Sequence, residues 1–407
     1  MINRVLETWA FDRSFLHNKM SFIAGPRQVG KTTLAQKFLK NLAQEDCYYN
    51  WDTLGFKQQF AKNPLFFKET FPPRAKNQWI VFDEIHKYPQ WKNLLKGYYD
   101  EMKDEVQFII TGSARLDLFR KSGDSLAGRY FLFKLFPLGP KDIVKTLYNR
   151  TKSWNPKDLL EDIPPANSTF SEAVDSLYNT TGFPEPFLDG TKDFYNRWKD
   201  IHLSLIINED IRDLTKITHI KKLETLVFLL PERVGSPISL NALRENLECS
   251  HESIKTWLEA FNKVFISFDI PPYTKKLSRA ILKEKKIYFW DWGIVEDTGK
   301  RFENFVAVQL ARVVTQWNEW GLGKYSLHYI RTKDGYEVDF AIALNNTVVL
   351  LIEVKEQATE VPKSFILIRE KLNNPLSFQV IHRKGFYKRT KENILVLGID
   401  RLLQLLP

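Results

Sequence analysis

Gly25-Pro26-Arg27-Gln28-Val29-Gly30-Lys31-Thr32 is the most informative stretch of this chain. It has two glycines, a lysine and a hydroxyl residue at the spacing of a phosphate-binding P-loop. The apolar residues 21–24 predict a short strand before it, and residues 33–39 predict an amphipathic helix after it. A loop between a strand and a helix N-terminus points backbone N–H groups at phosphate. The sequence therefore predicts a nucleoside triphosphate site; a glycine turn that carries a surface lysine is the alternative.

The side chains at the end of this loop have separate expected roles. We expect Lys31 to reach the outer phosphates and the Thr32 hydroxyl to take one position on Mg²⁺. The residues expected to contact the nucleotide are Gly25, Pro26, Arg27, Gln28, Val29, Gly30, Lys31, Thr32 and Thr33.

A second motif follows at Trp79-Ile80-Val81-Phe82-Asp83-Glu84. Its four apolar residues predict a buried parallel strand. We expect Asp83, at the end of that strand, to hold the Mg²⁺ shell and Glu84 to polarise the attacking water. The alternative is that the two carboxylates only cap the following turn. The pair thus predicts hydrolysis of the nucleotide as well as binding.

The next apolar strand, residues 107–111, ends in hydroxyl groups. Thr111 or Ser113 is expected to sense the γ-phosphate from the tip of this strand. Two arginines near this edge, Arg115 and Arg129, are candidates for neutralising transition-state charge, either within one chain or from a neighbouring subunit. Each is equally well explained as a surface ion-pair partner.

Composition favours a well-packed protein of two or three domains. The chain has 407 residues, of which 43% are hydrophobic and 14% aromatic. No apolar run approaches the roughly 18–20 residues of a membrane span, and the N-terminus has no secretory apolar segment, so we expect a soluble, cytoplasmic protein without a membrane partner. Cys47 and Cys249 are the only cysteines and lie far apart, which argues against structural zinc. The net charge of +10 fits a polyanionic partner without requiring one.

The first region, residues 1–147, alternates strand and helix patterns and predicts an α/β domain with a parallel sheet. Its strands are expected at 21–24, 47–51, 79–82, 107–111 and 129–134. Loop-forming residues then mark a boundary, and the alternation of strands and helices stops.

The middle region, residues 148–298, is expected to be helical. Helices at 239–247 and 252–263, followed by a strand at 264–270, form the pattern of a winged helix-turn-helix. Such a module either binds DNA or serves protein interaction. The exposed side chains of its second helix would be His251, Lys255, Asn262 and Lys263.

The C-terminal region, residues 299–407, places acids in apolar surroundings. Glu303 lies on the apolar stripe of a predicted helix, whereas Asp339 and Glu353 lie in two predicted strands. Lys355 shares a face with Glu353. An acid on a helix, then Asp, then Glu-x-Lys is the pattern of PD-(D/E)XK nucleases, in which carboxylates hold Mg²⁺ or Mn²⁺. The alternative is a set of buried salt bridges with Lys355.

Turn geometry sets a condition on this metal site. A plain two-residue turn at Asn345-Asn346 would set Asp339 opposite Ile352 and send Asp339 and Glu353 to opposite faces of the sheet. The nuclease hypothesis therefore requires a bulge or an odd-length connection, for example a three-residue loop at 344–346. We predict that the two carboxylates share a face.

Two basic stretches near these acids are candidates for contacting a nucleic acid backbone, although solvated faces need no partner. The first comprises Lys275, Lys276, Arg279, Lys283, Lys285 and Lys286, and the second Arg383, Lys384, Lys388, Arg389 and Lys391.

Nearly the whole chain resembles a family of prokaryotic AAA-type ATPases whose C-terminal half is a domain of unknown function related to PD-(D/E)XK nucleases. The resemblance implies a P-loop ATPase domain with an additional strand, a helical region with a winged helix, and a restriction-endonuclease-like α/β domain. Besides the two nucleotide motifs it rests on Ile110-Thr111-Gly112-Ser113, Gly182-Phe183-Pro184-Glu185, Lys286-Ile287-Tyr288-Phe289-Trp290-Asp291, Phe302-Glu303-Asn304, Glu337-Val338-Asp339-Phe340 and Ile352-Glu353-Val354-Lys355.

Together these features predict a Mg²⁺-dependent ATPase coupled to a DNA-directed nuclease module. Its expected ligands are ATP, ADP, Mg²⁺ and DNA, with Mn²⁺ as a substitute at the nuclease site and self-association as a further expectation. One alternative is an ATP-dependent DNA-binding or regulatory switch whose nuclease fold does not cut. Another is an ATP-gated adaptor that binds protein.

Overall fold

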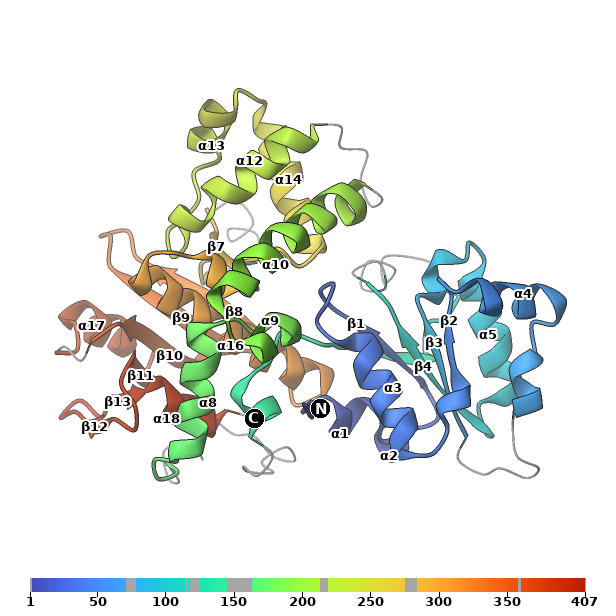
Figure 1. Ribbon diagram of the computed structural model, residues 1–407. Coiled ribbons are helices and arrows are strands. Elements are labelled where there is room, and N and C mark those ends of the chain that lie inside the picture. Colours follow the sequence, from blue (N-terminus) through green and yellow to red (C-terminus); the bar gives the residue numbers. More distant parts are fainter. Residues whose placement is uncertain are drawn as a thin grey trace. The chain divides into compact units, whose positions relative to one another are not determined.

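A computed structural model of the chain divides into two compact units, residues 3–136 and 137–407 (Figure 1). The first unit ends before the expected boundary at residue 147, and the division of the second unit near residue 298 stays a prediction. The structure describes residues 2–70, 78–113, 116, 125–144, 163–212, 219–274, 284–357 and 360–406.

The first unit is built on a five-stranded parallel sheet in the order β2-β3-β4-β1-β5. This confirms the predicted parallel α/β sheet, and each predicted strand is present within one or two residues. The strands are β1 (Met20–Ala24), β2 (Tyr48–Asn50), β3 (Gln78–Asp83), β4 (Val106–Thr111) and β5 (Tyr130–Lys134).

Both faces of this sheet are apolar, because successive side chains of a strand point to opposite sides. Phe22 and Phe82 enter one hydrophobic cluster, whereas Ile23 and Val81 enter the other. Helices cover the two faces, as a parallel sheet requires. They are α1 (Glu7–Ala10), α2 (Arg13–Leu16), α3 (Lys31–Asn41), α4 (Leu54–Lys62) and α5 (Trp91–Met102), with 3-10 turns η1 (Glu45–Cys47), η2 (Phe66–Thr70) and η3 (Ile85–Lys87).

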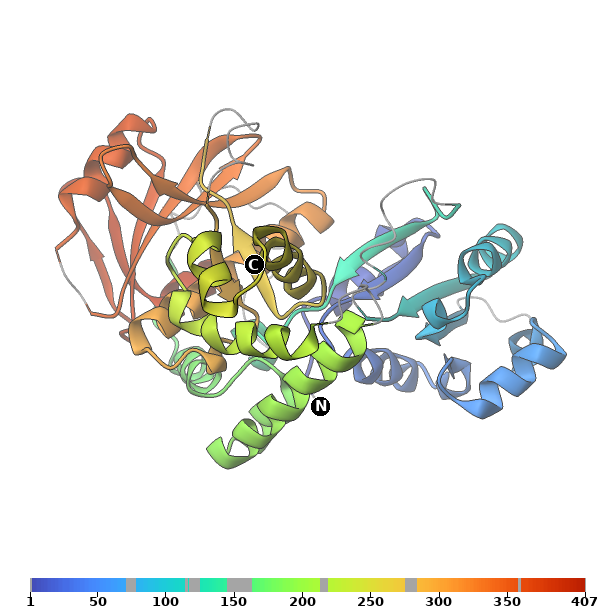
Figure 2. The ribbon, with the colours of Figure 1, turned by 90° about the horizontal axis from the view of Figure 1, so that it is seen from above.

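The second unit begins with helices, coloured green to yellow in Figures 1 and 2. They are α7 (Pro140–Ile143), α8 (Ser168–Asn179), α9 (Pro184–Asp189), α10 (Lys192–Leu205), the π-helix η5 (Ile206–Ile211), α12 (Ile220–Leu229), η6 (Pro231–Arg233), α13 (Leu240–Leu247) and α14 (His251–Lys263).

The two helices predicted at 239–247 and 252–263 are α13 and α14, and Ser239 and Ser250 cap their N-termini. The strand after them is shorter than predicted, because Phe265 adopts a left-handed conformation with φ 61° and interrupts the extended backbone. Strand β6 (Ser267–Ile270) therefore starts later and pairs antiparallel with β7 (Lys286–Phe289).

A mixed six-stranded sheet follows, in the order β12-β13-β11-β10-β9-β8 (orange to red in Figure 2). The long helix α16 packs against strands β8 and β10 of this sheet and buries a continuous apolar stripe. The strands are β8 (Tyr325–Arg331), β9 (Glu337–Leu344), β10 (Thr347–Lys355), β11 (Leu376–Ile381), β12 (Tyr387–Arg389) and β13 (Leu395–Gly398). The helices are η7 (Trp292–Ile294), α16 (Thr298–Glu319), α17 (Lys363–Lys371) and α18 (Ile399–Leu405).

Even α16, the longest of these helices, carries too many polar residues to cross a lipid bilayer, and no helix among the described residues is long and apolar enough to do so.

Candidate functional site

The predicted P-loop lies between the end of β1 and the start of α3, as the motif requires. Both of its glycines are needed for this shape. Gly30 has φ 95°, in the left-handed region that side chains disfavour. A Cβ on Gly25 would lie 2.2 Å from the carbonyl oxygen of Leu135 on the strand edge beside it. The loop can therefore take this path only with glycine at each position.

Lys31 begins helix α3 and turns its ammonium back onto the loop. Its Nζ donates to the carbonyl oxygens of Gly25, at 3.0 Å, and Pro26, at 2.6 Å. The side chain is buried, so the loop fixes the position of this positive charge. Val29 packs into a hydrophobic cluster, so it supports the loop from behind, while Thr33 is exposed on the helix.

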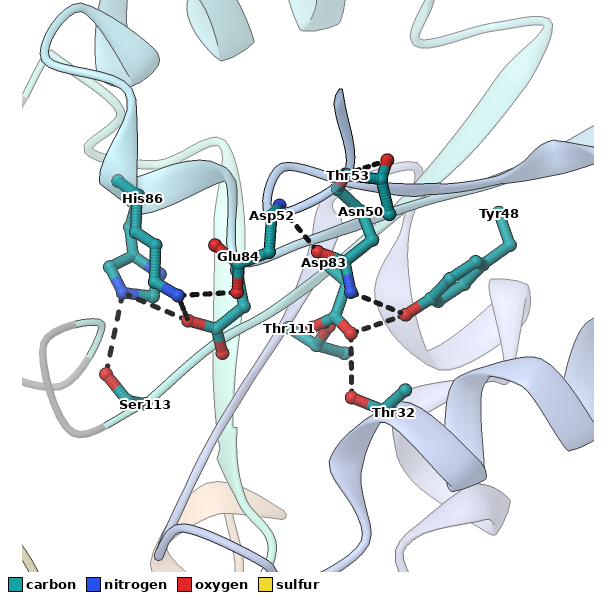
Figure 3. A network of polar contacts seen from close by, with 11 residues as sticks. Thr32, Tyr48, Asn50, Asp52, Thr53, Asp83, Glu84, His86, Thr111 and Ser113 are labelled. Atoms are coloured by element: carbon teal, nitrogen blue, oxygen red, sulfur yellow. Dashed lines mark hydrogen bonds and ion pairs between the residues drawn. The ribbon is translucent and has the colours of Figure 1, made fainter. Parts of the chain in front are cut away.

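Asp83, the last residue of β3, accepts hydrogen bonds from three hydroxyl groups (Figure 3). Thr32 Oγ1 lies 2.7 Å and the Tyr48 hydroxyl 2.6 Å from Oδ2, and Thr111 Oγ1 donates to Oδ1. The ends of α3, β2, β3 and β4 thus converge on one buried carboxylate. Oxygen donors of this kind suit Mg²⁺, and Thr32 and Asp83 are side by side as a shared shell requires.

Tyr48 is a member of this cluster that the sequence did not single out. Burial raises its pKa, and the hydrogen bond to Asp83 raises it further. The hydroxyl therefore stays protonated and serves as a donor. Tyr48 begins β2 and pairs in parallel with Val81 of β3, so its side chain lies on the same face as that of Asp83 two residues further along, and its hydroxyl reaches the carboxylate. A tyrosine at the start of the neighbouring strand was the available signal.

Glu84 is adjacent to Asp83 but faces different groups (Figure 3). Its backbone is left-handed, with φ 57° and ψ 18°, and its N–H donates to the carbonyl of Thr111. The carboxylate lies 3.4 Å from Lys87 Nζ and 3.6 Å from His86 Nε2. Burial raises the pKa of Glu84, and the charge of Lys87 partly offsets this. The sharp turn separates the two carboxylates, so they can take different roles.

Thr111 and Ser113 both lie at this edge, but their partners differ. The Thr111 hydroxyl bonds to Asp83, whereas Ser113 Oγ lies 3.5 Å from His86 Nε2. Thr111 therefore supports the predicted metal shell, and Ser113 lies on the Glu84 side of the site. Their role as sensors of the γ-phosphate stays a prediction.

Arg129 is far from this edge within the chain, contrary to expectation. It precedes β5, whose Tyr130 pairs with Met20 at the start of β1, whereas the P-loop follows the other end of β1. Five residues of strand separate the two ends by roughly 16 Å. Arg129 instead pairs with Asp100, with its Nε 2.8 Å from Oδ1. Only a neighbouring subunit's Arg129 remains a candidate, and Arg115 lies outside the described residues.

A second cluster of ionisable groups lies in the second unit, and a β-bulge assembles it. Asn345 and Asn346 form a two-residue turn, with φ 48° and 64°, so the suggested three-residue loop is wrong. The register shifts between Val348 and Leu350, which sets Ile352 opposite Phe340. Continuing that register places Glu353 opposite Asp339 on one face. The predicted shared face is therefore confirmed, through the bulge.

The acids of this cluster have well-defined partners. Asp339 Oδ2 accepts from the Val354 backbone N–H at 2.8 Å, and Lys355 Nζ lies 2.8 Å from Glu353 Oε1. From helix α16, Glu303 Oε1 accepts from the Tyr288 hydroxyl at 2.7 Å. All four residues expected from the sequence lie close enough to interact through their charges: burial lowers the pKa of Lys355, and the carboxylates of Glu353, Asp339 and Glu303 more than offset this.

Lys286 also belongs to this cluster, which corrects its expected place on a nucleic-acid-binding surface. Its side chain is 1% exposed, and its Nζ lies 2.5 Å from Glu337, 3.6 Å from Glu303 and 3.9 Å from Asp339. Lys286 begins strand β7, in which all four residues are buried, so its side chain points inward instead of lying on the surface. Glu337 is a fourth acid that the sequence analysis did not assign.

Burial and mutual repulsion perturb these acids. Burial, together with the negative charge of Asp339, raises the pKa of Glu303 to about 7 and that of Glu353 to about 7. Burial also raises the pKa of Asp339, against the opposing charge of Lys286. Perturbed groups of this kind gather at functional sites.

The carboxylate oxygens of this cluster are the kind of ligand that a hard divalent cation binds, but their positions are less suited to one. Carboxylate oxygens are ligands for Mg²⁺ and Mn²⁺, and Glu353 Oε2 is buried without a hydrogen-bond partner among the described residues. Among those residues, however, no three His, Cys, Asp or Glu side chains are placed to hold a metal ion. Among the described residues, the cation within 4 Å of both Glu303 and Asp339 is Lys286.

Helix α14 exposes part of the side-chain set expected to contact DNA. His251, Lys255 and Lys263 are exposed, whereas Asn262 is half-buried and accepts a hydrogen bond from Ser267. DNA binding by this helix stays a prediction. In the second basic stretch, Lys384 pairs with Asp175 at 2.5 Å. Of the first, Lys275, Lys276, Arg279 and Lys283 lie outside the described residues.

Comparison with known families supports an ATPase-like first unit. Residues 17–144 match a family described as an AAA domain. Residues 152–301 and 298–402 match two families described as domains of unknown function. The nucleotide motifs and the matched family agree, so the first unit contains an AAA-type P-loop ATPase-like domain.

Several curated relatives are described as uncharacterized proteins. One from Mycobacterium tuberculosis is 22% identical over 79% of this chain and 67% of its own length. One from Haemophilus influenzae is 24% identical, over 92% and 88%. One from Methanocaldococcus jannaschii is 25% identical, over 90% and 84%. The chain thus shares most of its length with these proteins.

Solved structures give only a distant likeness. The Bacillus subtilis DNA clamp loader delta protein has a TM-score of 0.27 at 14% identity, covering 64% of this chain and 88% of its own. PCH-2 of Caenorhabditis elegans has a TM-score of 0.24 at 16% identity, covering 63% and 70%.

Proposed function

We propose that the protein is a Mg²⁺-dependent ATPase whose reaction takes place at the carboxyl edge of the five-stranded sheet. The observation that carries this proposal is the convergence of Thr32 and Thr111 on Asp83, with Glu84 on the adjoining turn. A structural ion-pair network needs no glycine-shaped loop beside it. A nucleotide site needs the glycine-shaped loop and the carboxylates together, because the loop binds phosphate while the carboxylates hold the metal ion and orient water.

The chain's own groups divide the chemistry. Lys31 and the loop N–H groups would hold the phosphates, while Thr32 and Asp83 would hold Mg²⁺, which neutralises charge when bound. Glu84 would orient a water and accept its proton as the oxygen attacks the γ-phosphorus and the bond to the β-phosphate oxygen breaks. Its raised pKa favours this role, because a base works best near the operating pH.

Equilibrium binding tests the nucleotide site. Isothermal titration of the full chain with ATP and Mg²⁺ should give one site, and Lys31→Ala should weaken it about tenfold to a hundredfold, the size of a lost charged hydrogen bond. Lys40→Ala is the matched control, because Lys40 is exposed on the same helix. Equal affinity in wild type and Lys31→Ala would remove Lys31 from the site.

A second candidate function belongs to the acidic cluster of the second unit. We propose that it hydrolyses phosphodiester bonds of DNA, with Glu303, Asp339 and Glu353 as the residues that would hold Mg²⁺ or Mn²⁺. The bulge supports this proposal, because a plain hairpin would have separated Asp339 from Glu353. Bound metal would activate water, and Lys355 would stabilise the charge on the phosphate.

Lys286 supports the competing proposal of a regulatory switch that binds DNA or protein without cutting. A buried lysine already balances part of the acidic charge, so this cluster can stand without metal. Under either proposal, ATP binding would bias the state of the second unit through contacts that differ between nucleotide states.

Incubation with DNA separates these two proposals. Wild-type protein would be mixed with single-stranded, duplex and branched DNA in Mg²⁺ or Mn²⁺, with and without ATP. The nuclease proposal predicts cleavage that Asp339→Asn abolishes while ATP hydrolysis continues. Binding that weakens with salt, without cleavage of any substrate, favours the switch. Absence of both leaves the protein-binding adaptor.

A further inference from the structure

We propose that Lys286 is the resident cation of the acidic cluster, and that a divalent metal ion binds there only by displacing its ammonium. The proposal deepens the suggested nuclease function, since it names what controls metal binding at the same site. It rests on the contacts of Lys286, its fixed place in the fold and the balance of charge around it.

The contacts of Lys286 are those expected of a bound cation. Its ammonium lies within 4 Å of carboxylate oxygens from three residues on two elements: Glu337 and Asp339 on β9, and Glu303 on α16. The side chain is 1% exposed. A buried ammonium is costly unless anions surround it, so these acids and Lys286 stabilise one another. A metal ion bound by Glu303 and Asp339 would occupy the same negative environment.

The fold fixes the direction of the Lys286 side chain. Lys286 begins β7, opposite Ile270 of β6, and its ammonium lies 5.3 Å from the centre of the Tyr329 ring. Tyr288 lies two residues further along the same strand, hence on the same face, and donates to Glu303. Strand β7 thus places both the Lys286 ammonium and the Tyr288 hydroxyl against the acids.

Lys355 cannot replace Lys286 in this role. Lys355 contacts Glu353 and its side chain is 39% exposed, whereas Lys286 is the buried ammonium within 4 Å of Glu303, Glu337 and Asp339. The two lysines together leave the four acids Glu303, Glu337, Asp339 and Glu353 with more negative than positive charge when all are ionised. Removing Lys286 would increase that excess and remove the cation that repels an incoming metal ion.

Direct measurement of Mn²⁺ binding tests the proposal. Full-length protein without nucleotide would be titrated with Mn²⁺, and free Mn²⁺ would be followed by electron paramagnetic resonance. Lys286→Met should bind one Mn²⁺ at least about tenfold more tightly than wild type, because a repelling charge within about 4 Å is gone. Lys285→Met is the matched control. Lys285 precedes Lys286 in the chain but is 48% exposed and pairs with Asp269, so Lys285→Met should keep the wild-type Mn²⁺ affinity.

A second pair of variants locates the ion and guards against misfolding. Adding Asp339→Asn to Lys286→Met should abolish the gained site. Lys286→Gln removes the positive charge but keeps a polar side chain that can donate to Glu337, so it should raise Mn²⁺ affinity even if Lys286→Met fails to fold. The melting temperature of Lys286→Met should rise with Mn²⁺, whereas that of Lys285→Met should not.

The outcomes separate this inference from the nuclease proposal. Equal Mn²⁺ affinity in wild type, Lys286→Met and Lys286→Gln would overturn the role of Lys286, even if wild-type protein cleaves DNA. A gained site that survives Asp339→Asn would also overturn it. A gained site that Asp339→Asn removes would support it, whether or not any DNA is cleaved, because cleavage reports only on the proposed function.

Discussion

Replacing Glu84 by Gln should separate nucleotide binding from hydrolysis. Gln keeps the size of the side chain and its hydrogen-bonding capacity but cannot accept a proton. The left-handed backbone at φ 57° costs Glu and Gln the same, so the turn should persist. The phosphate contacts come from Lys31 and the loop, which the substitution does not touch. ATP affinity should therefore stay at its wild-type value.

The expected loss of turnover follows from the role of a positioned base. Such a group contributes about 10²- to 10⁴-fold, equivalent to about 3 to 5 kcal/mol of activation free energy. Phosphate release at saturating ATP would measure turnover, and titration calorimetry would measure binding. Glu101→Gln is the control, because Glu101 is an exposed acid of the same unit, paired with Lys68. Turnover of Glu84→Gln close to that of Glu101→Gln would refute the assignment.

Three further predictions test the two units. Arg312→Leu should lower the free energy of unfolding by about 3 to 5 kcal/mol in urea, because it removes the guanidinium that lies 3.1 Å from the buried carboxylate of Asp142; a loss below about 1 kcal/mol would contradict this. Because Glu303 and Glu353 have pKa values raised to about 7, stability in EDTA should fall as pH rises from about 4.5 to 7, and a slope unchanged in Glu353→Gln would contradict this. Arg129→Ala should leave the turnover of dilute monomer within about threefold of wild type, since its guanidinium pairs with Asp100 at the other end of the sheet; a larger loss would contradict its placement.

The parts of the fold that depend on local pattern could be predicted from sequence. The P-loop and the apolar strand before Asp83 each carry their signal within a few residues, and the structure places both as expected. Helices α13 and α14 have serine caps and an apolar stripe, so they too were recognised.

Features that depend on packing between distant segments were harder to predict. The bulge after Val348 is a shift in the pairing of β10 with β9, and the residues of the turn between these strands do not predict it. Lys286 lies among lysines in sequence, and only the three-dimensional position of the strand turns it inward. Arg129 is near Thr111 along the chain, yet strand direction places it at the opposite end of the sheet.

The central claim is that nucleotide hydrolysis takes place where Thr32 and Asp83 meet. The most direct test is the rate of phosphate release from saturating ATP by wild type and Asp83→Asn, each in Mg²⁺ and in EDTA. We predict turnover that requires Mg²⁺ and that falls at least about a hundredfold in Asp83→Asn, as expected when the metal loses its carboxylate. Turnover that persists in EDTA, or that Asp83→Asn leaves unchanged, would contradict the claim.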